Sequence, residues 1–291
     1  MLIESDVELS IITINYNSKA LTAQAVQSIV ECSPQICFEI IVVDNSSDYL
    51  EKYESDNANV TVIKGVENRG FGNACNIGVS NSQGKYILFL NNDTIMHKGT
   101  LEACLGYMRQ HSDVGALGVR TLLKDGNLDH ACKRGFPTPT ASLNYFLGID
   151  KKYPQSKRYG TYRQTFLADD EVSEVDSVAG SFLMMQRSLF DGLGGFDEDF
   201  FMYGEDLDLC YRVKQKGFSV IYYGKATITH FKGQSGLHLK SKEVVRHFYN
   251  AMILFYRKHY KKKYPIPITA LVYIGIKAKY TTTILKMKLG K

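Results

Sequence analysis

The chain has 291 residues, of which 44% are hydrophobic and 22% are charged. This composition is typical of a globular protein with a substantial core, and it excludes a mainly disordered chain. The six cysteines are scattered and form no C-x-x-C pair, so no zinc site is predicted and a reducing compartment is favoured.

Positive charge is concentrated near the C-terminus. Eleven of the 35 Lys and Arg residues follow Glu243, and no acidic residue does, which leaves 24 basic residues against 30 acidic ones. This distribution argues against a nucleic-acid groove through the body. We expect residues 244–291 to form a basic helical extension that meets an anionic membrane surface, the body of the protein or a second copy in a homo-oligomer.

The start of the chain carries no recognisable secretion signal, and no apolar run reaches the ~18 residues of a membrane-spanning helix. We therefore expect a cytoplasmic protein, with the inner face of the cell membrane as a candidate location.

The first half of the chain alternates strand and helix patterns. Strands are predicted at 9–14, 38–43, 59–63, 86–90 and 114–119, with helices at about 18–32, 71–80 and 101–109. This order predicts an α/β fold with a mostly parallel sheet and helices on both faces. Residues 121–174 contain prolines and no clear periodicity, and they are predicted to form a loop-rich insertion. A helix at 206–216, a strand at 219–223 and a basic helix at 244–260 follow.

Three polar clusters, at residues 13–17, 44–47 and 91–93, end predicted strands. Ligands of parallel sheets bind at this edge. Neither G-x-G-x-x-G after the first strand nor a phosphate-binding P-loop is present, which disfavours a hydride-transfer enzyme. A nucleotide would then be held by side chains and a metal ion.

Two strand-end carboxylates are candidate ligand contacts, each with a structural alternative. Asp44 could accept the imide N–H of a pyrimidine, or it could simply begin a turn. Asp93 could anchor a divalent cation, or it could cap the next helix.

Two later positions are candidates for catalysis and metal binding. The Glu205–Asp206 pair could supply a general base, or it could be the acidic start of a helix. His230 could ligate Mn²⁺ or Mg²⁺, although a lone histidine is more often structural.

These clusters, in this order, resemble the inverting family-2 glycosyltransferases with the GT-A fold. The resemblance covers about residues 9–235, and residues 1–243 are taken as the catalytic domain. It rests on Ile-Ile-Thr-Ile-Asn-Tyr-Asn at 11–17, Ile-Val-Val-Asp-Asn-Ser-Ser at 41–47, the loop and helix at 68–78, Phe-Leu-Asn-Asn-Asp at 89–93 and Phe-Met-Tyr-Gly-Glu-Asp-Leu-Asp-Leu-Cys at 201–210.

The resemblance implies a nucleotide-diphosphate sugar donor (dTDP or UDP) and a saccharide or lipid-linked acceptor. Asp206 is implied as the base, Asp93 and His230 as ligands of Mn²⁺ or Mg²⁺, with Gly233 and Ser235 in the same segment as His230. The acceptor side is expected at Gly180, Ser181 and Glu205. Donor contacts are expected at Thr13, Asn15, Asn17, Asp44, Arg69, Asn76, Asn91 and Asn92.

One departure concerns the Asp-x-Asp metal motif, because Asn91 stands at its first position. The metal site would then have one strong carboxylate anchor. The Asn-Asn-Asp form looks most like the bacterial rhamnosyltransferase branch, which uses dTDP-L-rhamnose in cell-surface polysaccharide synthesis. Transfer of another hexose or of galactofuranose from a UDP donor stays open. So does a non-catalytic nucleotide-sugar or glycan-binding module. A nucleotidyltransferase is disfavoured, because no Gly-rich basic loop follows the first strand.

Overall fold

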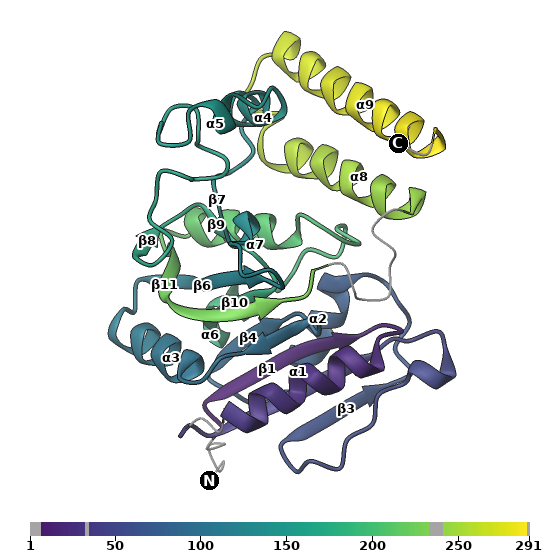
Figure 1. Ribbon diagram of the computed structural model, residues 1–291, viewed down its shortest axis with the longest axis vertical. Coiled ribbons are helices and arrows are strands. Elements are labelled where there is room, and N and C mark those ends of the chain that lie inside the picture. Colours follow the sequence, from purple (N-terminus) through teal and green to yellow (C-terminus); the bar gives the residue numbers. More distant parts are fainter. Residues whose placement is uncertain (1–6, 33–34, 233–240, 290–291) are drawn as a thin grey trace.

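A nine-stranded sheet forms the centre of the molecule, with helices on both faces (Figure 1). The computed structural model describes residues 7–32, 35–232 and 241–289. The strand order is β3-β2-β1-β4-β10-β6-β11-β5, and β8 pairs with β11. The strands that share one direction are β1 (Leu9–Asn15), β2 (Phe38–Asp44), β3 (Val60–Lys64), β4 (Tyr86–Leu90), β6 (Val114–Leu123) and β11 (Ser219–His230). The strands antiparallel to their neighbours are β5 (Thr94–Met96), β8 (Val172–Glu174) and β10 (Phe182–Gln186). The predicted α/β class with a mostly parallel sheet is confirmed.

Alternation along the strands sorts the core into two layers. Ile11 and Ile40 pack on one face with α1 (Lys19–Cys32) and α3 (Thr100–Gln110). Ile12 and Ile41 pack on the other with α2 (Phe71–Ser80), α6 (Arg187–Gly192) and α7 (Glu205–Gln215). Because successive side chains of a strand point to opposite faces, a continuous apolar run supplies both layers.

Residues 121–174 contain more regular structure than the predicted loop-rich insertion. They hold η2 (His130–Cys132), α4 (Pro139–Phe146) and α5 (Ile149–Lys152), and β7 (Lys133–Arg134) pairs with β9 (Ser177–Val178). The prolines misled the prediction, since Pro139 opens α4 behind a Thr138 cap that accepts a hydrogen bond from the Ala141 N–H. Proline is favoured at that first helical position.

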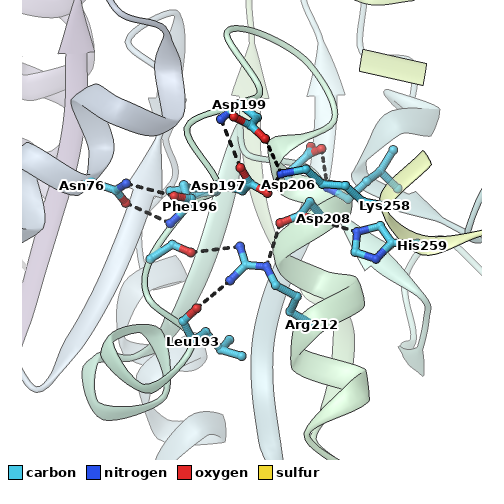
Figure 2. A network of polar contacts seen from close by, with 12 residues as sticks. Asn76, Leu193, Phe196, Asp197, Asp199, Asp206, Asp208, Arg212, Lys258 and His259 are labelled. Atoms are coloured by element: carbon cyan, nitrogen blue, oxygen red, sulfur yellow. Dashed lines mark hydrogen bonds and ion pairs between the residues drawn. The ribbon is translucent and has the colours of Figure 1, made fainter. Parts of the chain in front are cut away.

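The C-terminal segment forms two helices, α8 (Lys242–His259) and α9 (Ile266–Lys288). α8 packs on α7 through an aromatic cluster that includes Phe200, Tyr211 and Phe255. Ion pairs reinforce this contact: Lys258 of α8 lies against Asp197 and Asp199, and His259 of α8 lies against Asp208 of α7, which also pairs with Arg212 of its own helix (Figure 2). These ion pairs hold α8 against α7 and the loop before it.

α9 packs along α8 at the top of the molecule (Figure 1). Among the described residues, no helix combines the length and apolar character needed to cross a bilayer.

Candidate active site at the switch point of the sheet

A cavity of about 330 Å³ opens beyond the carboxyl ends of β1 and β4, where the strand order reverses direction. Two groups of predicted site residues line it. The β4 and β11 ends contribute Asn91, Asn92, Asp93 and His230. The acceptor side contributes Gly180, Ser181, Glu205 and Asp206. Eight predicted residues from distant parts of the sequence therefore meet in one place.

Asp93 and His230 face each other across the antiparallel β5–β11 contact. His230 Nε2 lies 3.0 Å from Asp93 Oδ1, and His230 Nδ1 lies 3.5 Å from Asp129 Oδ2. Burial lowers the pKa of His230, but the two carboxylates outweigh it and raise the pKa to about 9. The imidazole is thus held between two acids at the edge of the cavity.

The pair has the character of a partial metal site. Both side chains are buried, and Asp93 Oδ1 is paired with His230 Nε2 without meeting hydrogen-bond geometry to any described residue. With the imidazole deprotonated, one carboxylate oxygen and one imidazole nitrogen at this separation fit a cation such as Mn²⁺, whose binding would release the proton of His230. No cluster of three or more His, Cys, Asp or Glu suited to a metal occurs in residues 7–32, 35–232 and 241–289. Gly233 and Ser235 lie outside the described residues.

Asp206 sits at the first turn of α7 and lines the same cavity as the Asp93–His230 pair. Its Oδ2 accepts hydrogen bonds from Arg134 Nη2 at 2.6 Å and from the Gly180 N–H at 3.0 Å. The left-handed residues Tyr203 (φ 66°) and Gly204 (φ 83°) turn the chain into α7 just before it. Asp206 is thereby held in a fixed orientation at the cavity wall.

Glu205 is buried beside Asp206 and also lines the cavity. Its Oε2 has no hydrogen-bond partner among the described residues. Burial and the neighbouring Asp206 carboxylate raise the pKa of Glu205 well above its usual range. A protonated Glu205 can donate a hydrogen bond to a sugar hydroxyl.

The predicted donor contacts near β1 and β2 form a closed hydrogen-bonded network. The Asn15 amide donates to Asp44 Oδ2 at 3.2 Å and accepts from Thr22 Oγ1 at 2.7 Å. Thr22 in turn accepts from the Asn92 amide at 2.9 Å. Asp44 also accepts the N–H groups of Ser46 and Tyr53 and is absent from the lining. A direct contact between Asp44 and a base stays a prediction.

Four other predicted donor contacts lie off the cavity lining: Thr13, Asn17, Arg69 and Asn76. Thr13 is buried within β1. Asn17 bonds Ser47 and the Asp48 N–H, and the exposed Arg69 pairs with Glu67.

Asn76 is a correction to the prediction. Its amide donates to the Phe196 carbonyl at 3.0 Å and accepts the Phe196 N–H at 2.9 Å, and it also donates to Glu198 (Figure 2). These bonds fasten α2 to the 196–198 loop, and Asn76 is absent from the cavity lining.

The lining residues that were not predicted include three polar ones, Asn45, Asp129 and Arg134. Asn45 is buried, and its Oδ1 has no hydrogen-bond partner among the described residues. Its position directly after Asp44, in the polar cluster that ends β2, could have identified it as a site residue. Arg134 and Asp129 come from the insertion, where no motif marks them.

The comparisons with known proteins agree with this geometry. The profile of glycosyl transferase family 2 matches residues 10–194, and that of the N-terminal domain of galactosyltransferase matches residues 167–234. The chain is 34% identical over 197 residues to rhamnosyltransferase WbbL of Escherichia coli, covering 64% of this chain and 69% of that protein. It is 28% identical over 174 residues to an N-acetylglucosaminyl-diphospho-decaprenol L-rhamnosyltransferase of Mycobacterium tuberculosis, with coverage of 60% and 56%.

Solved structures with a similar fold are glycosyltransferases of low sequence identity. GalNAc-T7, crystallised with UDP, GalNAc and Mn²⁺, superposes with a TM-score of 0.59 at 14% identity, covering 86% of this chain and 48% of that one. Staphylococcus aureus TarS 1-349 in complex with UDP-GlcNAc superposes with a TM-score of 0.51 at 17% identity, with coverage of 85% and 65%. These likenesses show a shared GT-A fold.

Proposed function

The chain belongs to glycosyltransferase family 2, and from this premise we propose that it moves L-rhamnose from dTDP-L-rhamnose to a saccharide or lipid-linked saccharide acceptor. The proposed setting is bacterial cell-surface polysaccharide synthesis. The observation that carries the transfer chemistry is the single cavity lined by both Asp206 and the Asp93–His230 pair. The choice of rhamnose is supported by two relatives whose names specify rhamnosyltransferases.

Asp206 is the proposed general base. The acceptor hydroxyl gives its proton to the carboxylate as its oxygen bonds to the anomeric carbon, and the bond to the nucleotide diphosphate breaks. This single displacement inverts the anomeric centre. Arg134 and the Gly180 N–H orient the carboxylate for this step, and a positioned base typically contributes ~10²–10⁴-fold in rate.

Asp93 and His230 are the proposed ligands of a Mn²⁺ or Mg²⁺ ion. When bound, such an ion offsets the charge of the departing diphosphate. Lys232 also lines the cavity and is held 3.0 Å from Asp129, so it adds a fixed positive charge on the same side.

The pyrimidine is expected near the end of β2. Asn45 lines the cavity there, and its free carbonyl oxygen can accept the imide N–H of thymine or uracil. Asp44 would then hold the loop that presents Asn45, through its bonds to the Ser46 and Tyr53 N–H groups.

A second candidate is transfer of another hexose or galactofuranose from a UDP donor. The galactosyltransferase profile over residues 167–234 favours it, as does a relative named hexosyltransferase Agl10 from Haloferax volcanii, 24% identical over 217 residues. A non-catalytic sugar-binding module is less well supported, because the proposed base and both proposed metal ligands line one cavity.

A panel of nucleotide sugars tests the proposal. Thermal shift and nucleotide release are measured with dTDP-rhamnose, UDP-galactose, UDP-galactofuranose and UDP-glucose, with and without Mn²⁺. We expect the largest Mn²⁺-dependent response with dTDP-rhamnose. A larger response to a UDP sugar would select the second candidate. If a nucleotide sugar binds but no acceptor extract leads to nucleotide release, the non-catalytic sugar-binding module is favoured.

A further inference from the structure

The last helix, α9, has two distinct faces. Its inner face packs on α8: Ile276 is buried, Thr283 and Tyr249 hydroxyls lie 2.9 Å apart, and Thr269 and Tyr256 hydroxyls lie 3.0 Å apart. This face fixes the rotation of α9 about its axis, so the residues on the opposite side are presented outward.

The outer face of α9 carries a row of exposed apolar side chains, here called the apolar stripe, which is interrupted by Thr281 and Thr282, whose hydroxyls donate to the Lys277 and Lys279 carbonyls. Leu271, Ile274 and Leu285 are 68%, 64% and 51% exposed. Residues 267, 271, 274, 278 and 285 follow the spacing of three, four and seven that places side chains on one face of a helix. Several large apolar groups in one row are unusual on a surface open to water, and such a row marks an interaction surface.

Lysines border this stripe on both sides. At 100° per residue, Lys277 and Lys288 lie on one border and Lys279 and Lys286 on the other. No acidic residue follows Glu243. A second copy of α9 laid against the stripe would bring lysines against lysines with no carboxylate on either helix to pair with them. An anionic lipid surface matches both the apolar row and its charged borders.

We propose that the outer face of α9 binds the surface of an anionic phospholipid bilayer, with the helix lying in the headgroup region. α9 is attached to α8, which is held to α7 by the His259–Asp208 pair and to the loop before α7 by Lys258 with Asp197 and Asp199. Because α7 carries Asp206, this arrangement holds the active-site cavity in a defined position relative to the bilayer. The inference does not depend on which sugar is transferred.

Vesicle flotation of the whole chain tests the proposal. We expect it to float with vesicles containing phosphatidylglycerol at low salt, more weakly at high salt, and little with pure phosphatidylcholine. Leu271→Ser with Ile274→Ser should weaken binding at least ~10-fold through lost apolar burial. Lys277→Glu with Lys288→Glu should weaken it at least ~25-fold, at ~5-fold or more per lysine.

A matched control is available in the short helix η1 (Tyr49–Glu51). Tyr49 and Leu50 are 78% and 79% exposed but lie between Asp48 and Glu51. Tyr49→Ser with Leu50→Ser should leave vesicle binding unchanged. Circular dichroism and thermal unfolding establish that each variant is folded, which is expected because all the substituted side chains are exposed.

A fluorescence reporter gives a second, independent reading. The chain has no tryptophan, so Ile274→Trp introduces a single tryptophan fluorophore on the stripe, and Leu50→Trp introduces one at the control site. Anionic vesicles should shift the emission of the first to the blue and leave the second unchanged. The proposal is overturned if wild-type protein stays in the aqueous fraction, or if the position 274 fluorophore does not respond. It is also overturned if the Leu271→Ser, Ile274→Ser variant binds vesicles as tightly as wild type. The same holds if sedimentation velocity shows that wild type is a dimer and that this variant is a monomer.

Discussion

Two sets of buried polar groups around the cavity differ in how they are satisfied. Behind the cavity, at β1 and β2, Asn15, Asp44 and Thr22 bond to one another and to the main chain. In the cavity lining, Asn45 and Glu205 each keep a buried oxygen with no hydrogen-bond partner among the described residues, and Asp93 Oδ1 pairs with His230 Nε2. Leaving a buried polar atom unpaired costs ~1–3 kcal/mol. Where such an atom also lines the cavity, a bound ligand can supply the missing hydrogen bond.

The largest expected effect is on turnover. Asp206→Asn should lower the transfer rate by ~10²–10⁴-fold, because the base is lost while the shape of the cavity remains. Donor affinity, measured by calorimetry, should change little. Asp208→Asn is the matched control on the same helix. It breaks pairs with Arg212 and His259 and should lower the melting temperature with little change in turnover per folded molecule. Equal rates for Asp206→Asn and wild type would remove Asp206 from the mechanism.

The next effect concerns the metal site. Asp93→Asn should weaken Mn²⁺-dependent donor binding by ~10-fold or more, because it removes the one carboxylate of the Asp93–His230 pair. The reverse change, Asn91→Asp, restores the first acid of the motif and should tighten Mn²⁺ binding. Titrations of Mn²⁺ with dTDP present measure both. Unchanged Mn²⁺ affinity in both variants would mean that the ion binds elsewhere.

Asp44 and Asn45, which are adjacent at the end of β2, test the contrast between a hydrogen-bonded structural residue and an unpaired lining residue. Asp44→Ala removes the acceptor of two N–H groups and of the Asn15 amide, and should cost ~2–4 kcal/mol of unfolding free energy. Asn45→Ala should leave stability nearly unchanged and raise the donor KM ~3- to 10-fold through one lost hydrogen bond. Denaturant unfolding and steady-state kinetics distinguish them. If Asp44→Ala instead raised the donor KM and Asn45→Ala instead lowered stability, Asp44 would be the residue that contacts the pyrimidine.

The smallest expected effect is a pH dependence of stability. The pKa of Glu205 is raised from 4.5 to about 8 in the folded protein, so folding favours its protonated form. Its contribution is present below the unfolded pKa and is lost as the pH rises through the folded one. The unfolding free energy should therefore fall between pH ~4.5 and ~8, and Glu205→Gln should flatten this fall by more than ~1 kcal/mol. Parallel curves for the two proteins would show that Glu205 is ionised in the fold.

Much of the fold could be predicted because the strands are apolar runs that end in polar clusters. The same logic placed Asp93 at the edge of the sheet, whereas Asp206 and His230 were assigned to the site from the family resemblance. Strand-end patterns do not show which way a side chain points. The predicted donor contact of Asn76 failed for this reason, because Asn76 lies in a glycosyltransferase-like motif but bonds to Phe196. The prediction also missed Arg134, whose contact with Asp206 joins positions 72 residues apart and leaves no local pattern. Pro139 favours a loop by its residue type, although it begins α4.

Anomalous diffraction from crystals grown with Mn²⁺ and dTDP tests the central claim most directly, because Mn²⁺ scatters anomalously and its ligands can be seen. The account predicts one strong peak in contact with both Asp93 and His230 and with the diphosphate of dTDP, in the same cavity as Asp206. A peak away from this pair, or ordered dTDP bound in the cavity with no metal beside Asp93, would contradict it.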